Sequence, residues 1–230
     1  MALQLDTLKV RSLTAVFFVA VMLVGLLWNA WSFIILFLII HFGCWYEFIK
    51  LMRIILTKNK FLLILLSGLL YITMPVLMII DLGTTVEVNN NSGEPFYLFS
   101  SIIPCTIIFS IWINDTMAYI VGSMIGKTQL SSISPKKTWE GTIGGAVLCI
   151  VVISAIAYFT KLISVKDALI ISAICAFFGT LGDLLESKIK RMANVKDSGS
   201  IMPGHGGFLD RFDSFLIATI FVWIYIDFFA

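Results

Sequence analysis

The sequence contains few charged residues for its length. Asp, Glu, Lys and Arg together make up 13% of its 230 residues, whereas 59% are hydrophobic, and the mean hydropathy is +0.99. So small a supply of polar side chains cannot cover the surface of a soluble globule of this size. The composition therefore excludes a soluble domain and indicates an integral membrane protein.

Cysteine patterns typical of disulfides and of metal sites are also missing, as is a large net charge. The four cysteines lie in apolar runs without CxxC or Cys/His spacing, and we interpret them as small buried residues. The formal net charge of +2 predicts no nucleic acid or other polyanionic partner. No small-residue cleavage site follows the first apolar run, from Leu13 to Leu27, so we predict a retained helix and not a signal peptide.

Apolar runs long enough to cross a bilayer fill most of the chain. About 20 residues, each adding about 1.5 Å of helix, span roughly 30 Å of hydrocarbon. Seven runs approach that length, near residues 12–28, 31–52, 61–80, 96–122, 141–159, 168–185 and 208–229. We therefore predict an all-α fold, a polytopic transmembrane bundle of about seven helices with a polar active site at the cytoplasmic face.

We expect two regions along this bundle. Residues 1–95 would hold about three N-terminal transmembrane helices and an outer loop, and residues 96–230 would form a C-terminal catalytic transmembrane region. The second region has cytoplasmic loops at residues 123–140 and 186–207, both rich in charged and hydroxyl side chains. No long soluble domain, internal repeat or low-complexity tract interrupts this order.

Basic residues are concentrated on one side of the predicted bundle. If the N-terminus is cytoplasmic, 14 of the 16 Lys and Arg residues face the cytoplasm, whereas the outer loop, Asp81 to Pro95, has acidic residues and no basic one. The 14 residues are Lys9, Arg11, Lys50, Arg53, Lys58, Lys60, Lys127, Lys136, Lys137, Lys188, Lys190, Arg191, Lys196 and Arg211. Because cytoplasmic loops carry such an excess, we predict a cytoplasmic N-terminus and cytoplasmic polar loops.

Four aspartates in or beside the predicted helices are candidate metal ligands. An ionised carboxylate at the bilayer centre costs on the order of 2.5–3.5 kcal/mol, so several in one bundle need partners. Asp115 and Asp183 lie toward the cytoplasmic ends of their predicted helices. Asp210 and Asp213 share one helical face through their i, i+3 spacing. A few such carboxylates suit Mg²⁺; the alternative for the second pair is a helix-dipole and salt-bridge role.

The loop at residues 123–140 carries candidate anion-binding groups. Lys136 and Lys137 follow Ser134 just before a predicted helix, and the free N–H groups of a helix start favour anions. Lys127, in Gly-Lys-Thr, resembles the end of a P-loop, but the strand and the earlier glycine of that motif are missing, so the match is weak. The alternative is a basic patch that touches anionic lipid headgroups.

The one long polar stretch, Ser187 to Asp213, combines basic, flexible and acidic segments. Lys190, Arg191 and Lys196 come first and suit contacts with phosphate groups. His205 follows among glycines, which let backbone approach a ligand closely. This order suggests chemistry on a phosphorylated substrate.

The spacing of these polar residues resembles the signature of the phosphatidate cytidylyltransferases, the CDP-diacylglycerol synthases. The downstream pattern is Ser187-x-x-Lys190-Arg191-x4-Lys196-Asp197, then Pro203-Gly204-His205-Gly206-Gly207-x-x-Asp210-Arg211-x-Asp213. The upstream pattern is Asp115-Thr116-x-Ala118-Tyr119, then Gly126-Lys127 and Ser134-Pro135-Lys136-Lys137-Thr138-x-Glu140-Gly141. The resemblance covers residues 114–213, with fixed spacing among many polar residues.

The resemblance implies that CTP reacts with phosphatidic acid to give CDP-diacylglycerol and pyrophosphate, with Mg²⁺, at a bacterial inner membrane. It further implies a homodimer in contact with membrane lipids. The implied metal ligands are Asp183, Asp210 and Asp213, with Asp115 free to hold a second cation or orient a lysine. The implied catalytic residues are Asp115, Lys190, Arg191, Lys196, Asp197 and His205. The implied substrate-binding residues are Lys127, Ser134, Lys136, Lys137 and Ser187.

Two other classes of protein remain as alternatives. A CTP-dependent lipid kinase would use similar groups but must deprotonate a hydroxyl, whereas a lipid phosphate with a second pKa of about 6 needs no strong base. An ion-coupled transporter also places carboxylates in helices, but near the membrane midplane. A CDP-alcohol phosphotransferase is less favoured because its DGxxAR…GxxxDxxxD motif is absent. The one-sided charge favours chemistry at the membrane surface.

Overall fold

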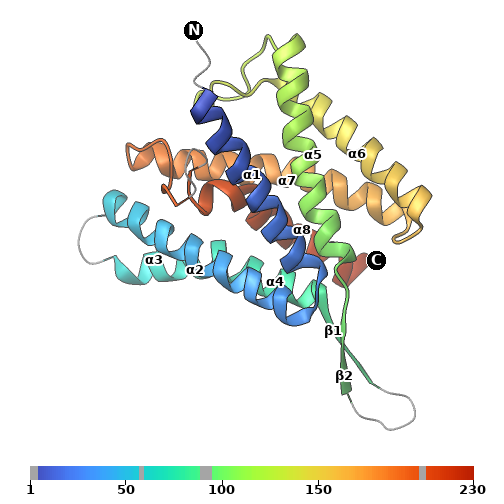
Figure 1. Ribbon diagram of the computed structural model, residues 1–230. Coiled ribbons are helices and arrows are strands. Elements are labelled where there is room, and N and C mark those ends of the chain that lie inside the picture. Colours follow the sequence, from blue (N-terminus) through green and yellow to red (C-terminus); the bar gives the residue numbers. More distant parts are fainter. Residues whose placement is uncertain (1–4, 57–59, 89–94, 202–205) are drawn as a thin grey trace. The chain divides into compact units, whose positions relative to one another are not determined.

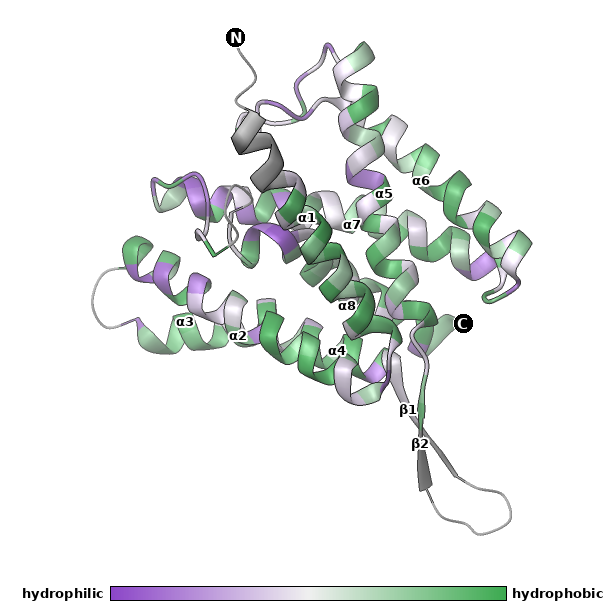
Figure 2. Cartoon of the chain, in the orientation of Figure 1, coloured by the Kyte–Doolittle hydropathy of each residue, from purple (hydrophilic) through white to green (hydrophobic). Residues whose placement is uncertain are grey.

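Helices dominate the structure, a computed structural model that describes residues 5–56, 60–88, 95–201 and 206–230 (Figure 1). This part of the chain has seven helices, if the continuous segment Phe61–Gly83 is counted as one. Six of the seven are long and apolar enough to cross a membrane, and their surfaces are largely hydrophobic (Figure 2). The predicted all-α transmembrane class is therefore confirmed.

The chain forms two compact units. The first comprises Met1–Ser101 and Met192–Phe212, and the second comprises Ile102–Arg191 and Asp213–Ala230. Most of the polar stretch found in the sequence therefore belongs to the same compact unit as the N-terminal helices.

The first unit begins with α1 (Leu5–Leu27) and α2 (Ala30–Ile55). Asn29 caps α2 because its side chain accepts a hydrogen bond from the Ser32 N–H at 2.9 Å. The Ser32 hydroxyl oxygen accepts one from the Asn29 N–H at 3.1 Å, which completes a capping box. The large side chains that project from α2 into the core include Phe33, Phe37 and Phe48.

One continuous helical segment follows, made of α3 (Phe61–Gly68), the π-helical turn η1 (Leu69–Thr73) and α4 (Met74–Gly83). The π-helical turn ends at Thr73, whose hydroxyl contacts the His41 Nε2 atom at 3.0 Å and accepts a hydrogen bond from the Trp45 indole at 2.9 Å. A Cβ atom at Gly68 would lie only 2.3 Å from that indole, so glycine allows this close packing on α2.

A two-stranded antiparallel hairpin stands where the sequence predicted an outer loop and the start of a helix. β1 (Thr84–Val88) pairs with β2 (Pro95–Phe99), with Thr84 opposite Phe99. The predicted helix start near residue 96 is therefore wrong, and α5 begins at Ile102. Apolar content alone does not distinguish a short strand from a helix turn, whereas β-branched and aromatic residues favour strands.

The second unit begins with α5 (Ile102–Ile125) and α6 (Trp139–Thr160), which lie side by side (Figure 1). Two glycines of α6 allow their backbones to touch. A Cβ atom at Gly141 would lie 2.7 Å from the Ala118 carbonyl oxygen, and one at Gly145 would lie 2.7 Å from the Ala118 nitrogen. Small residues permit such close helix packing in membrane proteins.

The last two helices are α7 (Val165–Met192) and α8 (Leu209–Phe229). α7 extends well past the predicted end near residue 185, and an i, i+4 ion pair between Glu186 and Lys190 stabilises the added turns. Asp183 is therefore internal to the helix and does not end it. A Cβ atom at Gly182 would lie 2.5 Å from the Asp213 carbonyl oxygen, so the two helix backbones meet beside Asp183.

We expect Gly145→Ala to destabilise the protein relative to Gly144→Ala. Both changes add one methyl group to α6, so the gain in helix propensity is equal. At Gly145 the new Cβ meets the Ala118 backbone at 2.7 Å, whereas at Gly144 it meets a Val121 methyl group at 2.6 Å, which can shift more easily. We expect a difference of roughly 1–3 kcal/mol, seen as a lower apparent melting temperature in detergent. Equal melting temperatures would contradict backbone contact between α5 and α6.

Candidate active site

A polar cavity lies in the second unit, between α5, α7 and the segment that joins α5 to α6. Its volume is about 440 Å³. The polar residues that line it include Asn114, Asp115, Ser123, Lys136, Lys137, Thr138, Thr142, Thr180 and Asp183. A larger cavity of about 640 Å³ in the first unit is almost entirely apolar and offers few groups for chemistry. The polar cavity is therefore the candidate active site.

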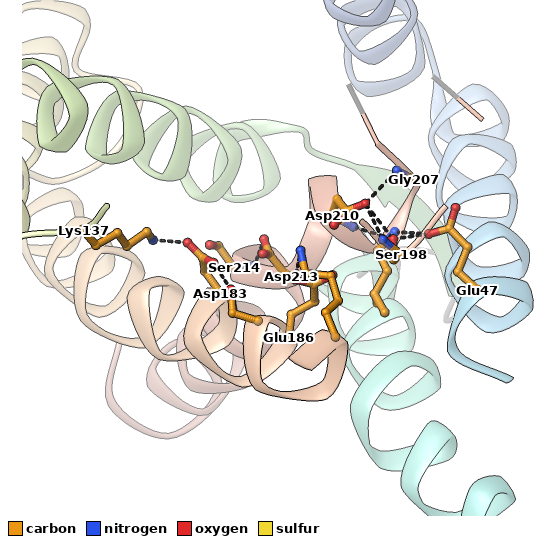
Figure 3. A network of polar contacts seen from close by, with 12 residues as sticks. Glu47, Lys137, Asp183, Glu186, Ser198, Gly207, Asp210, Asp213 and Ser214 are labelled. Carbon is orange, nitrogen blue, oxygen red and sulfur yellow. Dashed lines mark hydrogen bonds and ion pairs between the residues drawn. The ribbon is translucent and has the colours of Figure 1, made fainter. Parts of the chain in front are cut away.

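An ion pair between Lys137 and Asp183 forms part of the cavity wall (Figure 3). The two side chains are 31% and 23% exposed, so the pair is partly shielded from solvent but accessible from the cavity. The Ser187 hydroxyl, one turn further along α7, donates a hydrogen bond to Asp183 Oδ1 at 3.2 Å. The lysine-bearing segment is thus tied to α7.

Three carboxylates influence the pKa of the Lys137 ammonium group. Burial alone would lower the pKa of Lys137, but attraction by Asp183, with smaller contributions from Asp115 and Asp213, outweighs burial and raises the pKa above its usual 10.5. The ammonium group is therefore charged at neutral pH. Its contribution to stability is complete below pH 10.5 and is lost only as the pH rises through the raised pKa.

The oxygen atoms around this cavity fit a hard cation. Asp115, Asp183 and Asp213 interact electrostatically with one another and with Lys137. The Asn114 Oδ1 atom is buried and has no hydrogen-bond partner among the described residues. Mg²⁺ takes such ligands together with water and substrate phosphates. Within the described residues, no group of three or more His, Cys, Asp or Glu is arranged to hold a metal ion.

Hydrogen bonds hold the segment between α5 and α6 in place. The Glu140 carboxylate, in the first turn of α6, accepts hydrogen bonds from the backbone N–H groups of Lys127 at 3.2 Å and Thr128 at 3.1 Å. Thr138 caps α6 through its hydroxyl oxygen. The segment is hydrophilic and stands out against the apolar helices (Figure 2). These contacts fix both of its ends.

The predicted anion-binding lysines lie inside this fixed segment. The Lys137 N–H donates a hydrogen bond to the Ser134 carbonyl oxygen at 3.1 Å, which closes a turn. Lys136 is exposed and lines the polar cavity beside Lys137. The structure thus brings both ammonium groups to the cavity, and their contact with phosphate stays a prediction. Lys127 is also exposed, and its contact with phosphate stays a prediction.

The basic residues of the polar stretch have different surroundings. Lys190 pairs with the buried carboxylate of Glu186 at 2.5 Å. Arg191, Lys196 and Asp197 are exposed. Their contacts with substrate stay predictions, and the predicted catalytic residue His205 lies outside the described residues.

Asp210 belongs to the first unit, where it organises the end of the polar stretch (Figure 3). Its Oδ2 atom accepts hydrogen bonds from the backbone N–H groups of Ser198 at 2.9 Å and Gly207 at 2.8 Å. Its predicted part in a metal site with Asp183 and Asp213 stays a prediction. Asp183 and Asp213 belong to the second unit, whereas Asp210 belongs to the first.

Sequence reasoning missed two buried carboxylates. Glu47 on α2 is 1% exposed and Glu186 on α7 is fully buried. Glu47 lies in a predicted transmembrane run, where any carboxylate needs a partner. The rule that selected Asp115 would have selected Glu47 as well.

Comparison with known proteins agrees with this geometry. A model of the cytidylyltransferase family matches residues 98–229, which include every helix that lines the polar cavity. A protein of Staphylococcus aureus (strain COL) named phosphatidate cytidylyltransferase is 36% identical over 205 residues, covering 82% of this chain and 74% of its own. A protein of the same name from Bacillus subtilis (strain 168) is 46% identical over 122 residues, 52% of this chain and 45% of its own.

Another protein of that name, from Staphylococcus saprophyticus, is 38% identical over 176 residues, covering 74% of this chain and 62% of its own. The family model includes residues 114–213, whose polar residues carry the resemblance noted in the sequence. The chain belongs to the cytidylyltransferase family.

Proposed function

We propose that the protein transfers the cytidylyl group of CTP to phosphatidate, giving CDP-diacylglycerol and pyrophosphate. The observation that carries this proposal is the polar cavity in which Lys136 and Lys137 meet Asp115 and Asp183. Ammonium groups bind phosphates, and the carboxylates fit a metal that binds phosphates. Relatives that match most of this chain bear the name of the activity.

The proposed reaction needs no strong general base. A phosphate monoester has a second pKa of about 6, so a phosphatidate oxygen is already largely deprotonated at neutral pH. That oxygen attacks the α-phosphorus of CTP and forms a new P–O bond. The bond from the α-phosphorus to the bridging oxygen of the β-phosphate breaks, and pyrophosphate leaves with the electron pair. The protein has to hold two anions together and stabilise the charge that moves onto pyrophosphate.

The residues of the cavity divide this work between them. Lys137, held by Asp183, presents a fixed ammonium group, and Lys136 adds a second positive charge at the cavity. Asp183 and Asp213 would hold Mg²⁺ beside Asp115. The ion would neutralise phosphate charge and lower the barrier to loss of pyrophosphate. Ser187 keeps the Asp183 carboxylate oriented through its hydrogen bond.

The remaining signature residues are proposed to contact CTP from the polar stretch. We assign Arg191 and Lys196 to the triphosphate, because both are exposed cations that follow α7 or lie at its end. Asp197 and His205 are proposed to act in the same substrate-binding segment. Lys190 is available to phosphate only if it exchanges its ion pair with Glu186.

The protein is an integral membrane protein, and we propose that its polar cavity faces the cytoplasm. The support is the uneven distribution of Lys and Arg between the two sides of the predicted bundle. CTP is a soluble nucleotide, so a cytoplasmic cavity would have access to it. We further propose a homodimer in contact with membrane lipids, as the resemblance implies.

The activity is tested by incubating the purified protein with CTP labelled at the α-phosphate, phosphatidate and Mg²⁺. We expect the label in CDP-diacylglycerol and the release of unlabelled pyrophosphate, because the α-phosphorus is the atom transferred. A CTP-dependent lipid kinase, which the comparisons do not favour, would instead leave the label in CDP. Labelled CDP without pyrophosphate would overturn the proposal.

We expect Lys137→Gln to lower kcat/KM on the order of a hundredfold, because removing a group that stabilises transition-state charge has an effect of that size. Asp183→Asn should have a comparable effect, since it removes both the partner of Lys137 and a proposed metal ligand. Steady-state kinetics on the purified variants measure this. The control is Lys166→Gln, an exposed lysine in the first turn of α7 that should retain wild-type kinetics. Wild-type kinetics for Lys137→Gln would remove Lys137 from the mechanism.

Cysteine labelling tests the orientation. In a variant whose four native cysteines are replaced, Ser132→Cys would lie in the segment between α5 and α6, and Leu162→Cys in the turn between α6 and α7. Both positions are exposed. We expect a membrane-impermeant maleimide added to intact cells to label position 162 alone, and to label both positions after permeabilisation. Labelling of position 132 in intact cells would reverse the proposed orientation.

A further inference from the structure

The buried carboxylate of Glu47 binds both ends of one loop in the first unit (Figure 3). Its Oε2 atom accepts a hydrogen bond from the Ser198 hydroxyl at 2.7 Å and from the Leu209 N–H at 2.9 Å. Its Oε1 atom accepts one from the Phe208 N–H at 3.0 Å. Ser198 begins the loop and Phe208 ends it, so one side chain of α2 joins the two ends.

The loop backbone lies directly against this carboxylate. A Cβ atom at Gly199 would lie 2.2 Å from Glu47 Oε1, and one at Gly207 would lie 2.1 Å from the same atom. On the neighbouring turn of α2, a Cβ atom at Gly43 would lie 2.4 Å from the Phe208 ring. Glycine at positions 199 and 207 thus leaves room for the loop backbone to lie directly against the Glu47 carboxylate.

Glu47 also replaces a local cap for α8. The helix begins at Leu209, and the preceding residues Gly207 and Phe208 have no side-chain oxygen to accept the first backbone N–H groups. Glu47 accepts the N–H groups of Phe208 and Leu209 from 161 and 162 residues away in the sequence. Asp210 accepts the N–H of Gly207. These amides are thus already bonded and cannot serve as a separate anion site.

We propose that Glu47 is a positioning residue for the proposed cytidylyl transfer. It touches no reacting atom; it holds the two ends of the loop that follows Lys196 and Asp197, two residues proposed to take part in CTP binding. The family model matches residues 98–229 and does not include residue 47. The inference rests on the proposed function.

Glu47→Gln tests this proposal because it keeps the size of the side chain and removes its charge and one acceptor. If the loop spends less time in its binding arrangement, the apparent affinity for CTP falls by that fraction. We expect the KM for CTP to rise about tenfold, because Glu47→Gln weakens the charged hydrogen bonds that hold the loop. We expect kcat to stay within about twofold and the KM for phosphatidate to stay unchanged, because the arrangement with CTP bound is the same.

Hydrogen exchange gives a second measurement that does not depend on turnover. Amides of residues 198–201 and 206–212 should exchange faster in Glu47→Gln than in the wild type, and CTP with Mg²⁺ should restore their protection. The control is Thr73→Val, which removes the hydroxyl that binds two other side chains of α2 and does not touch the loop. Thr73→Val should change neither the KM for CTP nor exchange in the loop, even if it lowers the melting temperature.

Two results would overturn the proposal. Unchanged exchange in the loop of Glu47→Gln would show that Glu47 does not hold it. If exchange became faster but the KM for CTP stayed unchanged, Glu47 would be a purely structural residue. The same would follow if Glu47→Gln lowered kcat and Thr73→Val, at the same loss of stability, lowered it equally. If the wild type made no CDP-diacylglycerol, the proposed function would fail, and loop exchange alone would decide whether Glu47 anchors the loop.

Discussion

The ion pair between Lys137 and Asp183 is the interaction on which the candidate site depends. A charge among apolar helices is costly unless an opposite charge or hydrogen bond meets it, and here each charge of the pair is met by the other. The pair joins the segment between α5 and α6 to α7. Asp115 and Asp213 also interact electrostatically with Lys137, and carboxylates of this kind suit a metal ion that binds phosphates.

Glycine and buried carboxylates shape the rest of the molecule around polar groups. Gly141 and Gly145 bring α6 against the backbone of α5, and Gly182 brings α7 against α8 beside Asp183. In the first unit, Glu47 collects hydrogen bonds from the Ser198 hydroxyl and the start of α8. In both units, buried polar groups find hydrogen-bond or ion-pair partners within the protein, because the chain segments approach one another closely. These partners replace the water that would otherwise bind the polar groups.

Much of the site was predictable because its residue types are unusual in a membrane bundle. Asp115, Lys136, Lys137 and Asp183 stood out against apolar runs, and the structure places them around one cavity. The hairpin that replaced the predicted helix start at residue 96 was not predictable from hydropathy, which does not separate an apolar strand from an apolar helix. The continuation of α7 to Met192 depends on a local pair, Glu186 with Lys190, that the predicted boundary ignored.

The sequence by itself determined the membrane class, the approximate helix positions and the family, since these depend on composition, run length and the spacing of polar residues. Only the tertiary structure decided which distant groups meet. Lys137 forms an ion pair with Asp183, and Glu47 accepts a hydrogen bond from a loop residue more than 150 positions away in the sequence. Such partners are chosen by three-dimensional packing, because a buried charge or unbonded amide takes whichever complementary group the fold brings within hydrogen-bonding distance, whatever its place in the chain.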